Sequence, residues 1–216
     1  MAGLLSIVIA TTNEGKLNEL RALLGDLPLQ LLSVTDVLGD KPAISEDGTT
    51  FDQNALVKAR TISQATSLYA LADDSGLEVD ALGGRPGVRS ARFAHERATD
   101  AENNAALLRE LEEVGDDARS ARFRCVLALA NPWAPDHVET VEGSCEGFIA
   151  RAPRGSAGFG YDPLFIVPEL GDRVMAELSE DEKNSVSHRA RAVRALRPVL
   201  TRLIEERLRE VERTRG

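Results

Sequence analysis

The sequence predicts an α/β protein with a mixed sheet flanked by helices, and three observations support that fold class. Short apolar, β-branched segments alternate along the chain with segments whose apolar residues recur at helical spacing. The chain has 216 residues, of which 43% are hydrophobic and 28% charged, as in ordinary globular proteins. The sequence has no internal repeat and no low-complexity linker. We therefore expect a single α/β domain over residues 1–216, with a two-lobed version of that domain as the second possibility.

The first half of the chain predicts a strand, two helices and an acidic corner. Residues 4–10 form a short apolar run, and after a polar turn the leucines that follow recur at helical spacing. Residues 51–65 place apolar side chains on one helical face, which predicts a second helix. The apolar segments 69–72 and 77–82 are expected to be two short strands, with the acidic residues 73–74 in a corner at a strand end.

The second half predicts a helix, two longer strands, a loop and a final helix. A polar helix is expected over residues 100–114, followed by strands over 119–130 and 139–150. Residues 150–163 are rich in glycine and proline, which predicts a long loop. The last helix is expected to run from residue 187 to about residue 213.

The composition excludes several classes of function. A formal net charge of -9 disfavours nucleic acid as the main partner, because a phosphate backbone requires a basic face. The longest apolar runs, such as residues 126–130, fall far short of the roughly 18 residues that a membrane helix needs, and the N-terminus lacks the pattern of a signal peptide. We therefore expect no membrane association and a cytoplasmic protein, in which Cys125 and Cys145 are core residues rather than a disulfide.

Lysine is rare in this chain, and its positions are informative. Of 26 basic residues only four are lysines, so arginine serves at most surface positions. An ammonium is a compact charge that can approach a phosphate oxygen end-on, whereas a guanidinium is wider and planar. Lys41, beside a proline in a predicted loop, is attributed to chance. Lys16, Lys58 and Lys183 each fall in a distinctive segment and are candidate phosphate ligands.

The turn between the first predicted strand and helix is a candidate phosphate loop. Such a turn presents free backbone N–H groups and the positive end of a helix dipole to an anion. It is not a Walker P-loop, because the first glycine is missing and Leu17 follows Lys16 where Ser or Thr is required. The alternative is that Thr12 or Asn13 only caps the helix.

Adjacent carboxylates at Asp73 and Asp74 suggest a metal site. The two negative charges repel each other unless a bound cation or a proton offsets that repulsion, and Mg²⁺ is the natural candidate. Strand alternation directs the two side chains to opposite faces, so we expect one to reach the site while the other holds the loop in place. Glu46 or Asp47 offers a further oxygen ligand. The alternative is a solvated acidic turn.

Two later segments are candidates for contact with a flat ligand. Residues 158–163 carry two aromatic rings, those of Phe159 and Tyr161, beside glycines in the predicted loop, where a ring can stack on a base; the alternative is that the rings form a hydrophobic plug under the loop. Lys183, His188 and Arg189 come just before or at the start of the last helix and supply cationic or hydrogen-bonding groups. The alternative for His188 is an ordinary residue at a helix start.

Five segments, taken in order, resemble the inosine and xanthosine triphosphate pyrophosphatases; they are residues 6–24, 49–63, 72–94, 158–165 and 176–192. The resemblance spans nearly the whole chain. It implies an elongated α/β structure with a mixed sheet, two lobes and a substrate cleft between them, and a homodimer. It also implies hydrolysis of the noncanonical purine nucleotides dITP, ITP and XTP to the monophosphate and pyrophosphate. The implied cofactor is Mg²⁺, with Mn²⁺ as the candidate substitute.

Matched motif by motif, the resemblance implies a role for each candidate residue. Asp74 is the catalytic carboxylate and a metal ligand, and Glu46 is assigned as the second ligand. The chain departs from the family pattern at Thr12, where a small residue or glycine is common, and at residues 45–48, where many members carry two glutamates. The implied substrate-binding residues are Thr11, Thr12, Asn13, Glu14, Gly15, Lys16, Lys58, Ser75, Phe159, Gly160, Tyr161, Asp162, Lys183, His188 and Arg189.

The resemblance and elementary electrostatics together predict a mechanism. Water attacks the α-phosphorus and Asp74 orients and deprotonates it, while Mg²⁺ and the three lysines neutralise the phosphates. Donors from His188, Arg189 or the loop backbone would face O6 of hypoxanthine or xanthine and reject adenine. Three alternatives stay open: a pyrophosphatase of other modified or standard nucleotides, a non-catalytic nucleotide sensor, and an RNA-binding module, which the net charge disfavours.

Overall fold

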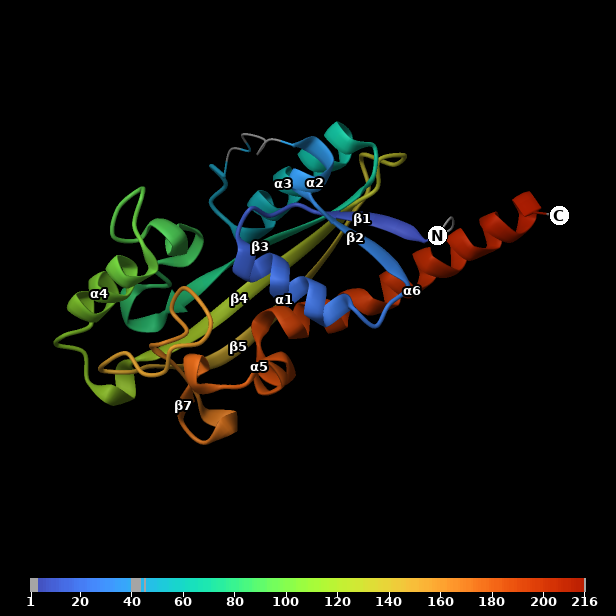
Figure 1. The fold of residues 1–216 in the computed structure, drawn as a ribbon. Helices are drawn as coiled ribbons and strands as arrows, with labels where there is room; N and C mark the ends of the chain where they lie inside the picture. Colours follow the sequence, from blue (N-terminus) through green and yellow to red (C-terminus); the bar gives the residue numbers. More distant parts are fainter. Residues whose placement is uncertain (1–3, 40–43, 45, 216) are drawn as a thin grey trace. The chain divides into compact units, whose positions relative to one another are not determined.

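The computed structural model describes residues 4–39, 44 and 46–215 and confirms an α/β fold with a mixed sheet flanked by helices (Figure 1). Seven strands form one sheet in the order β2–β1–β3–β4–β5–β6–β7. The chain divides into two compact units, which correspond to the two lobes expected; the substrate cleft expected with them stays a prediction. The first unit takes residues 1–74, 126–143 and 192–216, and the second takes 75–125 and 144–191. Lys41 lies outside the described residues.

Strand β1 (Leu5–Ile9) is an inner strand of the sheet in the first unit. It pairs in parallel with β2 (Leu29–Ser33) on one side and with the start of β3 (Tyr69–Val79) on the other. Most of β1 is buried, as expected for an unbroken apolar run in a parallel sheet that is covered on both faces.

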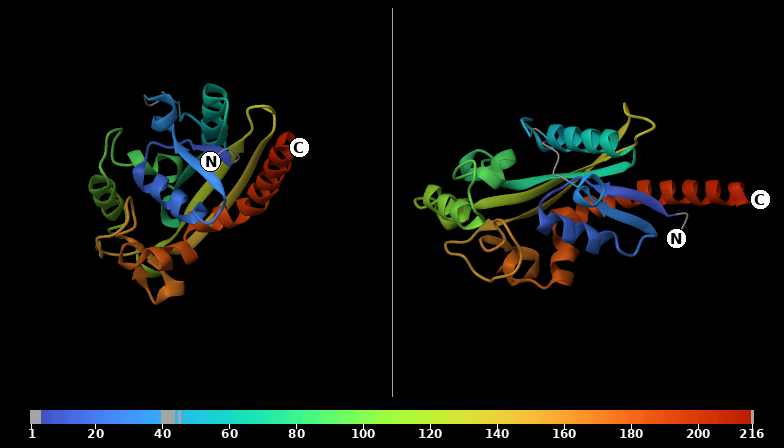
Figure 2. Two further views of the ribbon diagram at one scale, coloured as in Figure 1. Left: turned by 45° about the vertical axis from the view of Figure 1, so that its right-hand side comes forward. Right: turned by 45° about the horizontal axis from the view of Figure 1, so that its top comes forward.

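Helices cover both faces of these strands. Helix α3 (Phe51–Thr66) lies on one face, and α1 (Glu14–Leu24) and most of α6 (His188–Arg215) lie on the other (Figures 1 and 2). Arg197 of α6 joins the end of α1, because its guanidinium pairs with Asp26 at 2.7 Å. The short α2 (Val34–Leu38) follows β2 and begins with a capping box.

Strand β3 is continuous through the acidic pair, so the prediction of two short strands separated by a corner is wrong. Asp73 and Asp74 are only 1% and 6% exposed, and both lie inside the strand. The pairing of β1 with β3 reaches Leu71, and the backbone N–H of Ala10 still donates to the Leu71 carbonyl. The acidic pair therefore lies beyond the end of β1 but within β3. Two buried charges interrupted the apolar pattern without interrupting the strand.

The second unit contains the far half of β3 and parts of β4 (Ser120–Ala130) and β5 (Val138–Ile149). Strand β6 (Phe165–Val167) pairs antiparallel with β5, and β7 (Arg173–Val174) pairs antiparallel with β6. Apolar residues from these strands and from the following helices form one buried cluster, which includes Leu77, Leu107, Phe123, Tyr161 and Phe165.

The helices of the second unit differ from the prediction in one length and in one additional element. Helix α4 (Asp100–Glu110) ends earlier than the expected residue 114, although Leu111 is still fully buried. Helix α5 (Glu180–Val186) is an additional short helix before α6. Short 3-10 turns connect the larger elements at Asp80–Leu82, Gly87–Arg92, Asp116–Ala118, Pro168–Leu170 and Met175–Glu177.

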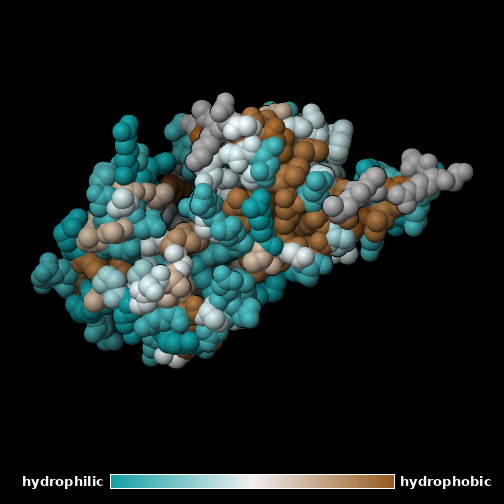
Figure 3. All heavy atoms as spheres, in the orientation of Figure 1, coloured by the Kyte–Doolittle hydropathy of each residue, from teal (hydrophilic) through white to brown (hydrophobic). Residues whose placement is uncertain are grey.

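The structure bears on two predictions made from composition, the state of the two cysteines and the lack of a membrane-spanning helix. Cys125 and Cys145 are buried thiols in β4 and β5, as predicted for core residues. None of the helices in the described part of the chain combines the length and the apolar content needed to span a bilayer. Figure 3 shows apolar side chains gathered over β1 and β2 on the face that it displays.

Candidate functional site

The loop between β1 and α1 has the geometry of an anion-binding turn. Asn13 caps α1, because its side chain accepts a hydrogen bond from the Lys16 backbone N–H at 3.0 Å. The Thr11 hydroxyl accepts from the backbone N–H of Asn13 at 3.2 Å. Thr12, Asn13 and Glu14 are exposed. The cap predicted as the alternative is therefore present, and it leaves an exposed turn at the positive end of the helix dipole.

The acidic pair of β3 meets two different lysines in the first unit. The Lys16 ammonium lies 2.7 Å from a carboxylate oxygen of Asp73, whose side chain is fully buried. The Lys58 ammonium lies 2.6 Å from Asp74 Oδ1 and also donates to the Asp73 backbone carbonyl at 2.8 Å. Consecutive strand positions point to opposite sides, so each carboxylate receives its own lysine.

Asn54 is a residue of this cluster that the sequence reasoning missed. Its side-chain NH₂ donates to Asp74 Oδ2 at 3.2 Å, and its oxygen accepts from the Gly48 backbone N–H at 2.9 Å. Asn54 is four residues before Lys58 in α3, and this i, i+4 spacing puts both side chains on the same helical face. Any Cβ at Gly48 would come within 2.5 Å of the Asn54 side-chain oxygen. That spacing was the only sequence signal for Asn54.

Burial and charge act on this cluster in opposite directions. Burial raises the pKa of Asp74, and the neighbouring ammonium groups of Lys58 and Lys16 oppose that rise without cancelling it. Burial alone would lower the pKa of Lys58, but Asp74 and Glu46 outweigh it and raise the pKa of the ammonium overall. Lys58 therefore stays protonated, beside a carboxylate that is a stronger base than an ordinary aspartate.

The donor set around Asp74 fits Mg²⁺ when a substrate supplies further oxygens. Glu46 Oε1 lies 3.4 Å from the same Lys58 ammonium that contacts Asp74, so two carboxylates approach one cation. Among the described residues, no group of three or more acidic, histidine or cysteine side chains is placed to hold a metal alone. Mg²⁺ commonly binds through one or two carboxylates together with phosphate oxygens and water. Asp74 and Glu46 are the two carboxylates that would hold the cation in such a site.

A second cluster lies in the second unit, around the glycine-rich loop. The Lys183 ammonium lies 2.6 Å from Asp162 Oδ2 and 5.0 Å from the centroid of the Phe159 ring. The Arg189 guanidinium carbon lies 5.8 Å from the same centroid, and Arg189 donates to the Ser75 hydroxyl at 3.0 Å. Two cations therefore approach one aromatic ring.

Two of the residues predicted to contact the substrate are almost fully buried in the protein. Tyr161 is 3% exposed, and its hydroxyl donates to the Ser90 carbonyl at 2.8 Å, so it forms the hydrophobic plug considered as the alternative. Burial also raises the pKa of the Tyr161 phenol. His188 is 4% exposed, and its ring stacks on Phe123 with centroids 4.8 Å apart. Substrate contact by Tyr161 and His188 stays a prediction.

The structure thus gathers the predicted residues into two groups, one in each unit. Lys16, Lys58, Asp74 and Glu46 belong to the first group, and Lys183 belongs to the second, where it pairs with Asp162. The fold and the two clusters define an α/β protein with an exposed turn at the start of α1 and lysines paired with buried carboxylates. The chain belongs to the Ham1 family, whose family model matches residues 7–199.

Named relatives and solved structures agree with this membership. A Bacillus licheniformis protein named dITP/XTP pyrophosphatase is 51% identical over 194 residues, which cover 90% of this chain and 97% of that relative. A Geobacter sulfurreducens protein of the same name is 52% identical over 191 residues, covering 88% and 94%. The HAM1 protein structure from Coxiella burnetii superposes with a TM-score of 0.83 at 46% identity, covering 92% of this chain and 100% of that one.

Proposed function

We propose that this chain hydrolyses noncanonical purine nucleoside triphosphates, namely dITP, ITP and XTP, to the monophosphate and pyrophosphate. The observation that carries the proposal is the cluster in which Lys58 joins Asp74 and Glu46 while Lys16 joins Asp73. Relatives that are about 50% identical over most of the chain carry the name of this activity. The removal of deaminated purines from the nucleotide pool is the cellular role that this activity serves.

The first cluster suits a triphosphate that arrives with a divalent cation. In their ordinary ionised forms, Lys16, Lys58, Asp73, Asp74 and Glu46 carry two positive and three negative charges, so the cluster has no surplus positive charge for a polyanion. Mg²⁺ held by Asp74 and Glu46 would supply that charge and polarise the phosphate oxygens. The lysines and the N–H groups at the start of α1 then bind the remaining oxygens.

Asp74 accepts the proton of the attacking water. Its contact with the Lys58 ammonium at 2.6 Å fixes the carboxylate in place for that proton transfer. Water attacks the α-phosphorus, and the bond to the bridging oxygen of pyrophosphate breaks. Lys16 and Lys58 stabilise the charge that develops on this leaving group.

The second cluster suits a 6-oxopurine base. Stacking on Phe159 is worth roughly 1–3 kcal/mol for any base, so it supplies affinity rather than choice. Arg189, which donates to Ser75, or His188 or the loop backbone would donate to O6 of hypoxanthine or xanthine. Adenine presents an amino group at that position, and two facing donors disfavour its binding.

One assay tests the activity and separates the alternatives. The protein is incubated with Mg²⁺ and dITP, XTP, dUTP, ATP or GTP, and the products are identified. We expect pyrophosphate from dITP and XTP. A preference for dUTP or ATP would indicate a different nucleotide pyrophosphatase, release of single phosphate would indicate cleavage of another bond, and binding without turnover would indicate a sensor.

The variant Asp74→Asn tests the proposed base. We expect turnover to fall by about 10²–10⁴-fold, because the amide cannot accept the proton from water. Asp52→Asn, at an exposed position in the first turn of α3, is the matched control and should retain wild-type turnover. Near wild-type rates in Asp74→Asn would remove Asp74 from this role.

The proposal also includes a homodimer, dependence on Mg²⁺ with Mn²⁺ as a substitute, and a cytoplasmic location. Light scattering coupled to gel filtration measures the first of these. Activity after chelation, followed by addition of Mg²⁺ or Mn²⁺, measures the second.

A further inference from the structure

Both backbone hydrogen-bonding groups of Gly160 are bound by side chains of α4. The Gly160 N–H donates to Asp100 Oδ2 at 2.6 Å, and the Gly160 carbonyl accepts from the Asn104 side-chain NH₂ at 2.8 Å. Gly160 has a φ of +61°, a conformation that residues other than glycine rarely adopt. The loop is therefore held at one peptide position by two side chains of a neighbouring helix.

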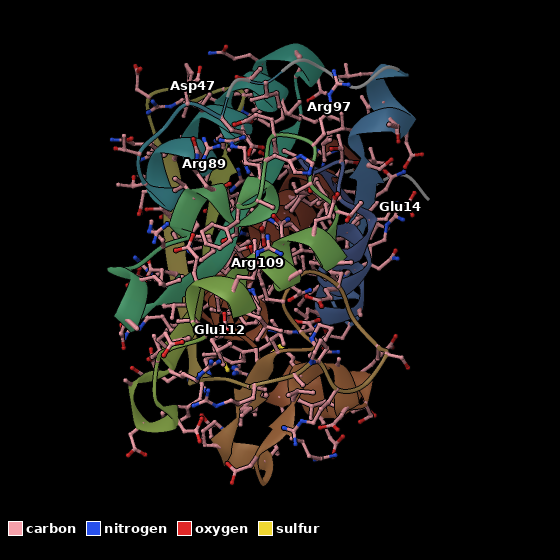
Figure 4. All side chains as sticks on the ribbon, turned by 90° about the vertical axis from the view of Figure 1, so that its left-hand side faces the viewer. Glu14, Asp47, Arg89, Arg97, Arg109 and Glu112 are labelled. Carbon is pink, nitrogen blue, oxygen red and sulfur yellow. The ribbon has the colours of Figure 1, made fainter. Side chains whose placement is uncertain are left out.

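The start of α4 is organised to present these two side chains. Thr99 closes a capping box with Glu102, which fixes the first turn of the helix and places Asp100 at its start. Asn104 lies one turn later on the same face, and its NH₂ also donates to the Asp100 carbonyl at 2.9 Å. Figure 4 looks onto α4, the green helix that carries the labelled Arg109, with the glycine-rich loop beside it.

Burial of the Asn104 side chain carries a desolvation penalty that its hydrogen bonds must offset. The residue is only 7% exposed, and within the described part of the chain its side-chain oxygen has no hydrogen-bond partner. An apolar side chain of similar size would avoid that desolvation penalty. The feature that offsets the penalty is the pair of bonds donated by the NH₂ group, one of which goes to Gly160.

The residue next to Gly160 is the one that carries the proposed base contact. The Phe159 N–H donates to Asp162 Oδ2 at 3.0 Å, and Asp162 in turn pairs with Lys183. Gly158, on the other side of Phe159, has a φ of +78° and no space for a Cβ, which would clash with the Asp162 carboxylate. Phe159 is thus fixed from Asp162 on one side and from α4 on the other.

We propose that Asn104 and Asp100 are positioning residues for purine binding, which act by fixing the Gly160 peptide and through it the Phe159 ring. This inference rests on the proposed function, because it requires Phe159 to contact the base. Neither residue has to touch the nucleotide. Loss of the Asn104 donor should therefore weaken base binding while the phosphate chemistry in the first unit is preserved.

The experiment compares Asn104→Leu with Asn103→Leu. Asn103 is the neighbouring residue of α4, is 2% exposed, and makes the same kind of bonds, but to the backbone of Ala91 and Ala94. We expect Asn104→Leu to raise KM for dITP about fivefold, the equivalent of one net hydrogen bond, with a smaller change in kcat. Asn103→Leu should lower the melting temperature comparably and leave KM near the wild-type value.

A binding measurement keeps the test independent of turnover. The reporter is Phe159→Trp in a Trp133→Phe background, which replaces the single tryptophan of the chain. We expect Asn104→Leu to increase acrylamide quenching of this reporter and to weaken dIMP binding about fivefold, in parallel with KM. Asn104→Asp, which keeps the side-chain shape and loses both donors, replaces Asn104→Leu if the leucine variant does not fold.

The outcomes separate the two claims. If the wild-type protein binds dIMP and Asn104→Leu leaves dIMP affinity, KM or reporter quenching unchanged, the positioning role is wrong. An equal rise of KM in Asn103→Leu would also overturn it, because the effect would then be one of general stability. If the wild-type protein binds dIMP but releases no pyrophosphate from dITP, the proposed function fails while the dIMP measurement still decides the positioning role.

Discussion

Each lysine that the composition singled out, and that the structure describes, holds a buried carboxylate. Lys16 pairs with Asp73, Lys58 with Asp74 and Lys183 with Asp162. A compact ammonium on a flexible stem can enter such a site, whereas the planar guanidinium is wider. Rarity of lysine was thus a usable signal at the residue scale. It gave no signal for the asparagines, because Asn54 and Asn104 acquire their partners only when the fold brings distant backbone and side chains together.

Lys58 should contribute strongly to stability, because its removal leaves Asp74 charged and buried. We expect Lys58→Met to lower the free energy of unfolding by about 3–5 kcal/mol, the usual cost of breaking one side of a buried pair. The double variant Lys58→Met/Asp74→Asn should recover most of that loss. Urea unfolding of the four proteins in this cycle gives the coupling energy, and a value near zero would contradict the pair geometry at 2.6 Å.

At the scale of elements, long periodic segments were predictable and short ones were not. Helix α3 and strands β4 and β5 lie within a residue or so of their expected bounds, since their apolar patterns persist over several turns or pleats. Strands β6 and β7 are too short to establish a pattern. Strand β2 is as long as β1 but is mostly only half-buried and includes a glutamine, so it lacks the apolar run that identified β1. In β3 the pattern misled, because a polar pair with buried partners looks the same in sequence as a solvated corner.

Helix α5, which carries Lys183, is held at its start by a second ionic contact. Arg173 binds both carboxylate oxygens of Glu182, at 2.6 and 3.3 Å, and the Ser179 backbone N–H donates to the same carboxylate. The Arg173 guanidinium and the Ser179 N–H lower the pKa of Glu182 from its ordinary 4.5 to about 2. A lowered carboxyl pKa adds stability at pH values above 4.5, and this contribution is lost as the pH falls towards about 2.

Glu182→Gln should therefore lower the melting temperature at pH 6. The difference in melting temperature between this variant and the wild type should become smaller as the pH falls below 4.5. Glu180→Gln is the control, because it removes a charge from the same turn of α5 and leaves the Arg173–Glu182 pair in place. Its smaller decrease in melting temperature measures the interaction of one charge with the helix dipole alone. Thermal unfolding followed by circular dichroism gives both differences. A Glu182→Gln difference that stays constant down to pH 2.5 would show that the ion pair is not its cause.

At the scale of the whole molecule, the chain passes between the two units four times. The crossings fall inside β3, β4, β5 and α6, at residues 74–75, 125–126, 143–144 and 191–192. Neither unit is therefore a continuous stretch of sequence, and each crossing element contributes hydrogen-bonded residues to both. Local patterns predicted most of these elements but not this division, which depends on which distant segments pack together.

These crossings predict that the two units unfold in one transition. The chain carries its own reporters: Trp133, the only tryptophan, is in the first unit with its ring 5.6 Å from that of Tyr69, and both cysteines are in the second unit. Burial raises the pKa of the Cys145 thiol to about 11, so this thiol should react slowly until the second unit opens. We expect tryptophan fluorescence and pulsed thiol labelling to give the same urea midpoint. Labelling of the thiols at a urea concentration where the Trp133 signal is still native would show that the second unit opens alone. The elements shared by the two units would then not be enough to make their unfolding cooperative.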